Sequence, residues 1–342
     1  MESAPRLSVV MPCYDVARWL PRCLDETLAA LPPDGELLAV DDGSHDATLA
    51  ILQDRSKADS RLTVIAAPHG GVSAARNRAL DVARGTYVFF VDPDDGVEPD
   101  FFSALTAALD RDGADCCICG YAERADGSNA CGSAIALKGD YRLGTNAEIV
   151  AKFLPRIFGY SFDDIRAWYA GKLLFADREL AYSWRMAFRR ATIEAAHVRF
   201  DPSLELNEDA LFNAEFLLAA QAMTCVDRPL YRMTLRDSGA VRTIYADGLR
   251  YCRNKLAMLK KREALDRRAG GRLRPLYAGT CVLSVLEILS HVAKRRLPAG
   301  EGLRLLRAYL VEPPVRAAVK DFPLSVRRPC VAVAVLLLRI LL

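Results

Sequence analysis

Residues 89–95 most constrain what this chain can fold into, because an apolar run ends there in three carboxylates within four positions. Phe89 and its neighbours have the composition of a buried strand, and Asp92, Asp94 and Asp95 follow directly. Carboxylates at the end of a buried strand lose hydration and repel one another unless a positive group balances them. A hard divalent cation with phosphate oxygens among its ligands would do so, and the segment predicts a Mg2+ or Mn2+ site for a nucleoside diphosphate. The alternative is a solvated acidic turn.

Short apolar segments and helical patterns alternate along the first 120 residues. Strands are expected at 7–11, 37–40, 62–66, 87–91 and 115–120, and helices at 17–31, 47–55, 72–83 and 99–109. This alternation predicts an α/β fold with a doubly wound, mostly parallel, Rossmann-like sheet. Ligands of such sheets bind beyond the carboxyl ends of the strands, where Asp42 and Asp94 fall. We therefore expect both acidic motifs to face one crevice.

The second half of the chain is predicted to complete and cap this site. Residues 122–144 are rich in Gly, Asp, Asn and Ser, which indicates an irregular connection or a hairpin over the site. Helical patterns resume at 147–158, 193–196, 209–219 and 246–310.

Charge is distributed unequally along the chain. Residues 241–342 hold 21 lysines and arginines against 7 acidic residues, whereas residues 1–240 hold 25 against 36. Residues 331–342 are almost wholly apolar, but they are fewer than the ~20 needed to span a bilayer. Two interpretations stay open: a buried terminal helix, or a monotopic anchor on an anionic membrane surface, which the basic charge favours.

The start of the chain and its cysteines bear on location and redox state. No apolar leader precedes the first predicted strand, so we expect a cytoplasmic protein, with peripheral attachment to the inner face of the cell membrane as an extension. Three of the ten cysteines, Cys116, Cys117 and Cys119, lie inside a predicted strand. No second pair at zinc spacing and no nearby histidine accompany them, and we expect reduced core residues.

Short motifs occur in a fixed order at residues 7–15, 38–46, 70–77, 90–95 and 207–209. In sequence, order and spacing they resemble the family 2 glycosyltransferases, which have the GT-A fold and invert the anomeric centre. The resemblance covers about residues 6–240. It implies a GT-A domain over residues 1–240, with a nucleotide-binding half at 1–120 and an acceptor half at 121–240. Residues 241–342, a basic helical C-terminal region, lie beyond its guidance.

The resemblance assigns nucleotide-binding roles near the first three motifs. Pro12 and Tyr14 would form the base pocket, Asp42 would accept the imide proton of uracil, and Arg76 would reach the base or the phosphates. Two alternatives remain open. Asp41 and Asp42 could cap the following helix, and Arg76 could pair with an aspartate of the crevice. His69 stands where the family usually has asparagine.

The fourth motif resembles the family's Asp-x-Asp. The resemblance implies that Asp92 contacts the ribose or a metal-bound water, and thereby takes part in the metal site. Asp94 would hold the Mn2+ or Mg2+ ion that bridges the two phosphates. Asp95 would support Asp94 or lie in the donor-sugar pocket.

The acceptor side is assigned from two later segments. Asp209 would be the general base for the acceptor hydroxyl and Glu208 would help to hold that hydroxyl, whereas the alternative is an acidic helix start stabilised by the helix dipole. Trp184 could stack on a sugar face, but buried aromatic packing is an equal alternative. A basic loop around Tyr231, Arg232 and residues 238–242 could close on the diphosphate.

These features predict a metal-dependent, inverting glycosyltransferase. Its donor would be a nucleotide sugar, with UDP as the expected nucleotide, and its acceptor a hydroxyl of a glycan or lipid-linked glycan in cell-surface polysaccharide synthesis. The chain lacks the Gln-x-x-Arg-Trp element of processive synthases, which favours one transfer per binding event. A nucleotidyltransferase would need a Gly-rich basic loop after the first strand, which is absent here. The remaining alternative is a non-catalytic nucleotide-sugar or glycan-binding subunit of a polysaccharide assembly complex.

Overall fold

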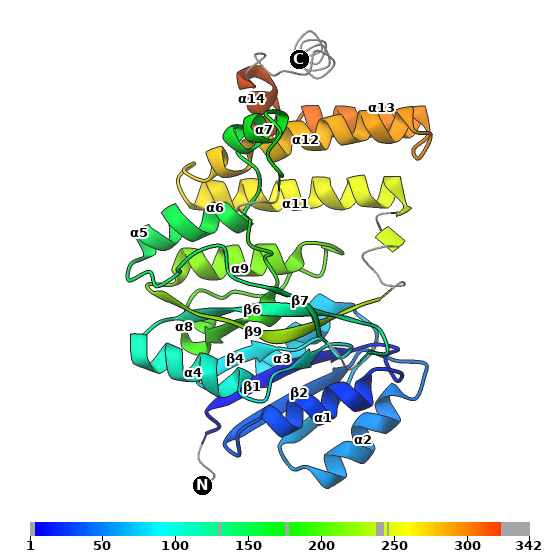
Figure 1. The fold of residues 1–342 in the computed structure, drawn as a ribbon. Helices are drawn as coiled ribbons and strands as arrows, with labels where there is room; N and C mark the ends of the chain where they lie inside the picture. Colours follow the sequence, from blue (N-terminus) through cyan, green and yellow to red (C-terminus); the bar gives the residue numbers. More distant parts are fainter. Residues whose placement is uncertain (1–3, 129–130, 175–177, 237–242, 245, 323–342) are drawn as a thin grey trace. The chain divides into compact units, whose positions relative to one another are not determined.

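The computed structural model in Figure 1 describes residues 4–322, apart from 129–130, 175–177, 237–242 and 245. The chain forms two compact units. The first consists of Met1–Phe153, Ala181–Pro202 and Glu208–Asp237, and the second of Leu154–Leu180, Ser203–Asn207 and Ser238–Leu342. The chain therefore enters the second unit twice before the predicted boundary at residue 240.

In the described residues, nine strands of the first unit form one sheet, in the order β3-β2-β1-β4-β8-β6-β9-β5, with β7 paired to β6. Strands β3, β2, β1 and β4 are mutually parallel, as is the pair of β6 and β9, whereas β8, β7 and β5 add antiparallel pairs. The predicted α/β sheet with a parallel core is confirmed, and the antiparallel strands make it mixed. The strands are β1 (Leu7–Cys13), β2 (Gly35–Asp41), β3 (Leu62–Ala66), β4 (Tyr87–Phe90), β5 (Gly96–Val97), β6 (Cys116–Ala125), β7 (Cys131–Ile135), β8 (Met186–Arg189) and β9 (Met223–Leu235).

The helices of the first unit follow the predicted alternation, with ends that differ by a few residues. Residues 122–144 include the end of β6 and all of β7, which pair as an antiparallel hairpin, while the expected position of this segment over the site stays a prediction. The helical elements are α1 (Leu20–Ala30), α2 (Thr48–Ala58), α3 (Val72–Val82), α4 (Phe101–Asp112), α5 (Asn146–Glu148), the π-helix η1 (Ile149–Phe153), the 3-10 helix η2 (Ser183–Arg185), α8 (Arg190–Ala195) and α9 (Glu208–Ala219).

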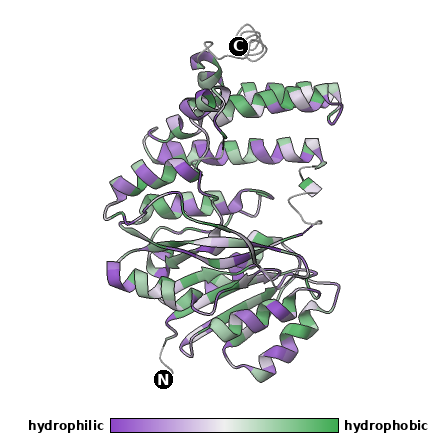
Figure 2. Ribbon diagram, in the orientation of Figure 1, coloured by the Kyte–Doolittle hydropathy of each residue, from purple (hydrophilic) through white to green (hydrophobic). Residues whose placement is uncertain are grey.

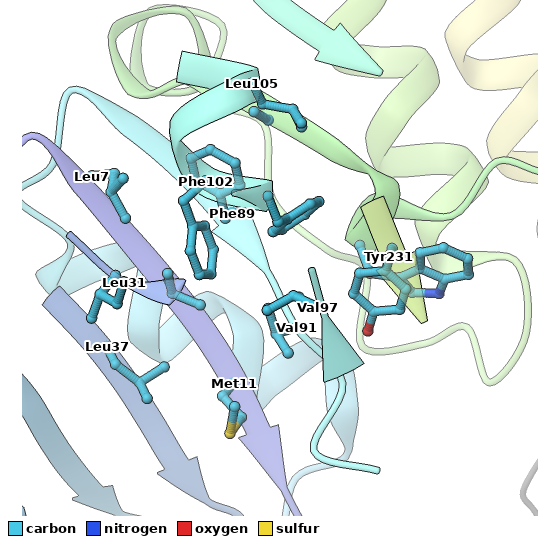
Figure 3. Close-up of a cluster of buried hydrophobic side chains, with 14 of the residues drawn as sticks. Leu7, Met11, Leu31, Leu37, Phe89, Val91, Val97, Phe102, Leu105 and Tyr231 are labelled. Carbon is cyan, nitrogen blue, oxygen red and sulfur yellow. The ribbon is translucent and has the colours of Figure 1, made fainter. Parts of the chain in front are cut away.

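Successive residues of a strand point to opposite faces of the sheet, and both faces of the central strands β1, β2 and β4 are buried. On one face, Leu7, Phe89 and Val91 belong to a core that also includes Phe102 and Leu105 of α4 (Figure 3). Leucines and a cysteine of α1 close the same core: Leu20, Cys23, Leu24 and Leu28. Near-continuous apolar strands are what a sheet covered on both faces requires.

The opposite face of the sheet carries an aromatic core. The ring of Phe90 in β4 makes edge-to-face contacts with Phe188, Phe200 and Phe212, at centroid distances of 5.7, 5.1 and 5.5 Å. Phe200 and Phe212 stack on each other at 4.1 Å. This core fixes α9, which begins with Glu208 and Asp209, against the strand that leads into Asp92.

The second unit is helical in its described residues. Its elements are α6 (Leu154–Ile157), α7 (Phe162–Tyr169), α11 (Gly248–Arg268), α12 (Arg274–Ala293), α13 (Ala299–Leu310) and α14 (Pro313–Asp321). Figure 2 shows α12 as the more hydrophobic of the two long helices of this unit. Among the described residues, α12 alone has the length and hydropathy of a membrane span, and half of that stretch is buried within the structure. The apolar segment at 331–342 lies outside the described residues.

The cysteines of the described core are free and buried, as the sequence predicted. Cys116, Cys117 and Cys119 lie in β6, and burial raises the pKa of each thiol above its ordinary value. These thiols are therefore protonated packing groups.

The aromatic core predicts a large stability effect at one position. Phe90→Ala should lower the free energy of unfolding by about 3–5 kcal/mol, because it removes a fully buried ring that contacts three others. Urea denaturation followed by circular dichroism measures the change. Val82→Ala, at a half-exposed position of α3, is the control and should have little effect. A loss for Phe90→Ala no larger than that of the control would contradict this description of the core.

Candidate active site

Strands β2 and β4 flank β1, and these three parallel strands end at one edge of the sheet. Asp42 follows β2 on one side of β1, while Asp92 and Asp94 follow β4 on the other. Cys13, the last residue of β1, is affected by both groups, because burial and then Asp41, Asp92 and Asp94 raise the pKa of its thiol. The two acidic motifs therefore lie at the same edge of the sheet.

Asp42 is buried and organises the loop that leads into α3. Its Oδ1 accepts hydrogen bonds from the Gly70 amide at 2.9 Å and from Arg78 at 3.1 Å. Its Oδ2 accepts from the Gly71 amide at 2.7 Å and lies 3.0 Å from Nδ1 of His69. Three hydrogen bonds thus hold the carboxylate, and Nδ1 of His69 also lies 3.0 Å from the main-chain oxygen of Asp42. A contact between Asp42 and a nucleobase stays a prediction.

Asp41 does not cap the helix after β2, so this alternative interpretation was wrong. Its Oδ2 accepts a hydrogen bond from the Ser44 amide at 3.3 Å, before α2 begins at Thr48. Asp46 instead accepts the Thr48 amide at 2.9 Å. The Oδ1 atom of Asp41 is buried and has no hydrogen-bond partner among the residues that the structure describes.

Pro12 and Tyr14 lie at the end of β1, where the base pocket is predicted. Pro12 is buried, whereas Tyr14 is 40% exposed. The ring of Tyr14 lies 4.3 Å from that of His69 and 6.2 Å from that of His45. His69 is therefore a neighbour of both Tyr14 and Asp42. An exposed aromatic ring beside two imidazoles is suited to stacking against a flat base.

Asp94 is buried and forms an ion pair with Arg236, just beyond β9, at 2.7 Å. Burial and repulsion by Asp92 raise the pKa of Asp94 to about 6, and Arg236 opposes this shift. The guanidinium of Arg236 also lies 4.9 Å from the ring centroid of Trp19. Arg236 is thus the positive group that balances the predicted metal ligand in this structure.

Asp95 is held by β9. It accepts hydrogen bonds from the Tyr231 hydroxyl at 2.9 Å and from the Thr234 amide at 2.7 Å. Tyr231 in turn accepts a hydrogen bond from the Asp92 amide at 3.1 Å. Burial, followed by the charges of Asp94 and Asp92, raises the pKa of Asp95 well above its ordinary value. These contacts tie Asp95 to β9, and its expected role beside Asp94 or in the donor-sugar pocket stays a prediction.

A divalent cation at this edge would depend on Asp92 and Asp94. The described residues contain no group of three or more histidine, cysteine or carboxylate side chains suited to a metal. Both aspartates offer hard oxygen ligands, and a cation would relieve the repulsion that raises the pKa of Asp94. Their present partners are guanidinium groups, Arg76 for Asp92 and Arg236 for Asp94. The pair would suit a cation that takes its remaining ligands from phosphate and water.

Arg76, on α3, is buried and contacts three carboxylates. Its Nη2 donates to Asp92 at 3.0 Å, and its Nη1 donates to Glu208 at 3.1 Å and to Asp209 at 2.8 Å. The guanidinium carbon lies 5.0 Å from the ring centroid of Phe200. Arg76 thus pairs with crevice carboxylates, the second of the two roles considered for it.

Negative charge is in excess around Arg76. Burial and Asp209 raise the pKa of Glu208 to about 7, although Arg76 opposes the shift. Burial also raises the pKa of Asp209, against the opposing effect of Arg76. The Oδ2 atom of Asp209 accepts the Ser183 amide at 3.1 Å. Carboxylates with raised pKa values in a polar cluster are typical of catalytic sites.

Trp184 is buried in the core, which corrects the prediction that it stacks on a sugar. Its ring stacks on Tyr182 at 4.8 Å and on Tyr231 at 4.2 Å. Tyr121 approaches it edge-on at 5.3 Å. Only 3% of Trp184 is exposed, because these rings cover it, and the packing alternative holds.

Arg236 and Arg78 were not predicted to act at this edge, whereas Ser183 lies in the segment 183–185 that resembles an acceptor-side segment of the family. Arg236 lies between the two basic segments assigned to a closing loop, so excess positive charge after β9 was the available signal. Arg78 follows the motif at 70–77 directly. Ser183 contacts Asp209 through its backbone amide, and because every residue except proline has this group, the residue type does not predict the contact. Residues 238–242 of the predicted loop lie outside the described residues.

Comparison with known proteins bears on the family and the fold. The model of the family described as glycosyl transferase family 2 matches residues 8–166. The uncharacterized glycosyltransferase EpsJ of Bacillus subtilis is 28% identical over 227 residues, which span 66% of this chain and 60% of EpsJ. The putative glycosyltransferase EpsH of the same organism is 26% identical over 288 residues, which span 82% of this chain and 77% of EpsH.

Two solved structures have a similar fold. TarS from S. aureus (residues 1–349) in complex with UDP-GlcNAc aligns with a TM-score of 0.57 and 19% identity, over 89% of this chain and 91% of that one. The mannosyltransferase PcManGT from Pyrobaculum calidifontis, in complex with GDP-Man and Mn2+, aligns with a TM-score of 0.51 and 14% identity, over 99% and 88% of the two chains. The GT-A fold predicted from the sequence is thereby confirmed. The motifs, the family model and these relatives agree, and the region at residues 8–166 is that of a family 2 glycosyltransferase.

Proposed function

We propose that this chain transfers a sugar from a nucleoside diphosphate donor, with UDP as the expected nucleotide, to a hydroxyl group of a glycan or lipid-linked glycan, with inversion at the anomeric carbon. The observation that carries the proposal is the ion-pair network of Arg76. It joins Asp92, which follows β4, to Glu208 and Asp209 at the start of α9. The carboxylates assigned to the donor side and to the acceptor side thereby pair with the same guanidinium group, that of Arg76.

The donor would lie along the edge where β1, β2 and β4 end. Tyr14 offers an exposed ring for the base, and Asp42 holds the Gly70–Gly71 amides beside it. A divalent cation held by Asp94 and Asp92 would neutralise the negative charge that develops on the leaving diphosphate. Arg236, released from Asp94, would be free to pair with a phosphate. The donors bound by TarS and PcManGT support a nucleotide sugar as substrate.

The acceptor hydroxyl would lie at the start of α9. As its oxygen attacks the anomeric carbon and the bond to the diphosphate breaks, Asp209 would take the hydroxyl proton. Attack from the side opposite the leaving group inverts the centre. The Ser183 amide and Arg76 hold one oxygen each of Asp209, and this fixes the direction in which the carboxylate faces. Relatives named for polysaccharide synthesis, among them the succinoglycan biosynthesis protein ExoO of Rhizobium meliloti, support a glycan acceptor.

Two substitutions separate donor binding from chemistry. Asp94→Asn should abolish transfer and weaken the Mn2+-dependent rise in melting temperature that UDP produces, because it removes a charged ligand of the cation. Asp209→Asn should keep that rise and lower kcat by about 10²–10⁴-fold, because it removes the base. Thermal shift with UDP, with and without Mn2+, and release of labelled sugar from a panel of nucleotide sugars measure both effects.

Asp54→Asn, at an exposed site on α2, is the matched control and should behave as the wild type. Wild-type activity in either Asp94→Asn or Asp209→Asn would refute the corresponding role. A wild-type chain that binds UDP with Mn2+ but transfers and hydrolyses no donor would support the non-catalytic alternative.

The pKa of Glu208 predicts a pH dependence. Its raised value of about 7 means that the carboxylate is neutral below that pH and charged above it. If the charged form holds the acceptor hydroxyl, kcat should fall as the pH drops through about 7. Glu208→Gln should lower kcat and remove this limb from the pH–rate profile. A limb that persists unchanged near pH 7 in Glu208→Gln would assign it to another group.

The basic C-terminal region predicts attachment to an anionic membrane surface, which would bring the site to lipid-linked acceptors. The full chain should sediment with vesicles that contain anionic lipid at low salt and be released at high salt, because surface charge is screened. Vesicles of neutral lipid are the control. Unchanged binding after deletion of residues 331–342 would assign attachment to the basic helices, and absence of the full chain from the vesicle pellet would contradict the proposal.

A further inference from the structure

Arg76 connects two parts of the first unit that are far apart in sequence. It lies on α3 and contacts Asp92 within the same nucleotide-binding segment, while Glu208 and Asp209 lie more than 130 residues further on. The two sides use different nitrogens, with Nη2 on the Asp92 side and Nη1 on the α9 side. Because a guanidinium is planar and rigid, the two groups of carboxylates are held at a fixed separation.

We propose that Arg76 is a positioning residue that sets the place of the general base relative to the bound donor, and that it makes no contact with the nucleotide. This inference rests on the proposed function and gives Arg76 a role different from the nucleotide contact implied by family resemblance. The residue acts through Asp209 and Asp92.

The burial of Arg76 supports this role. Its side chain is 3% exposed, and its terminal nitrogens already donate to three carboxylates. The ring of Phe200 covers the guanidinium, with its centroid 5.0 Å from the central carbon. Asn77 fixes Phe200 in turn, with hydrogen bonds of 2.8 Å to its carbonyl and 2.9 Å from its amide. The position of the guanidinium is therefore determined by its surroundings before any ligand binds.

The general base Asp209 needs a positioning residue for two reasons: repulsion from the neighbouring carboxylates and the orientation of its own carboxylate. Two adjacent acidic groups and Asp92 share one guanidinium, so each carboxylate is drawn toward the same point while the three repel one another. Arg76 takes Oδ1 of Asp209 and the Ser183 amide takes Oδ2, and the pair fixes the plane of the carboxylate. A base turned by a small angle would no longer face a hydroxyl placed next to the donor.

The lysine substitution tests the role. Arg76→Lys keeps one positive charge but lacks the planar fork, so it cannot hold Asp92 and Asp209 together. We expect kcat to fall about 100-fold while the KM for the donor sugar and the UDP-dependent thermal shift stay unchanged. Arg111→Gln, which removes an exposed arginine that pairs with Asp112 on α4, is the control and should retain wild-type kcat.

A double mutant separates positioning from a general loss of structure. If Arg76 acts through the base, Arg76→Lys should cost little further activity once Asp209→Asn is present, because the group that it positions is gone. Equal losses of kcat in the wild-type and Asp209→Asn backgrounds would overturn the proposal, since a merely structural effect would add.

Measurements of donor binding and of transfer distinguish a failure of the positioning role from a failure of the proposed function. A raised donor KM or a lost UDP shift in Arg76→Lys, with kcat intact, would make Arg76 a nucleotide ligand and overturn the positioning role alone. A wild-type chain that transfers no sugar from any donor tested would overturn the proposed function and this role with it. Transfer by the wild type, a reduced kcat in Arg76→Lys and a non-additive double mutant would support both.

Discussion

Repulsion between buried carboxylates at one edge of the sheet is the constraint on which the first unit depends. Parallel strands end there in acidic residues, and packing on both faces of the sheet keeps water from them. Three arginines oppose this charge. Arg78 pairs with Asp42, Arg236 with Asp94, and Arg76 with Asp92 after β4 and with the two carboxylates at the start of α9. The arginines come from α3 and from the end of β9, so the balance of charge ties elements together that share no backbone hydrogen bonds with one another.

The sequence predicted the parts of this design that depend on local pattern. Runs such as residues 87–91 show a fully buried strand because every residue is apolar, and the position of Asp42 and Asp94 after such runs places them at the carboxyl edge. That inference needs only the parallel order of β2, β1 and β4, which the alternation of strands and helices provides. The assignment of the motifs to family 2 needed only their order and spacing.

Partners that depend on tertiary packing could not be predicted in the same way. From the sequence, Arg76 could bind either the nucleotide or a crevice carboxylate. Its observed carboxylate partners depend on the packing of α9 near α3, through the stacked rings of Phe212 and Phe200. Trp184 shows the same limit, because an aromatic residue suits a sugar or a core equally well until the rings that cover it are known. The two early excursions of the chain into the second unit, at Leu154–Leu180 and Ser203–Asn207, leave no compositional signal at all.

The arginines also explain how this acidic edge of the sheet can fold in the absence of a metal ion and a nucleotide. Asp42, Asp92 and Asp94 are each paired with an arginine within the protein. The pKa of Asp94 is raised only to about 6 because Arg236 opposes the effects of burial and Asp92. A diphosphate adds negative charge to this edge, and it can be accommodated only if further positive charge arrives or an arginine changes partner. Arg236 is suited to such a change because it pairs with one carboxylate and rests against Trp19, whereas Arg76 is held by three carboxylates and an aromatic ring. The two arginines thus differ in how many groups hold them, and Arg76, held by more of them, contacts the residues proposed for proton transfer.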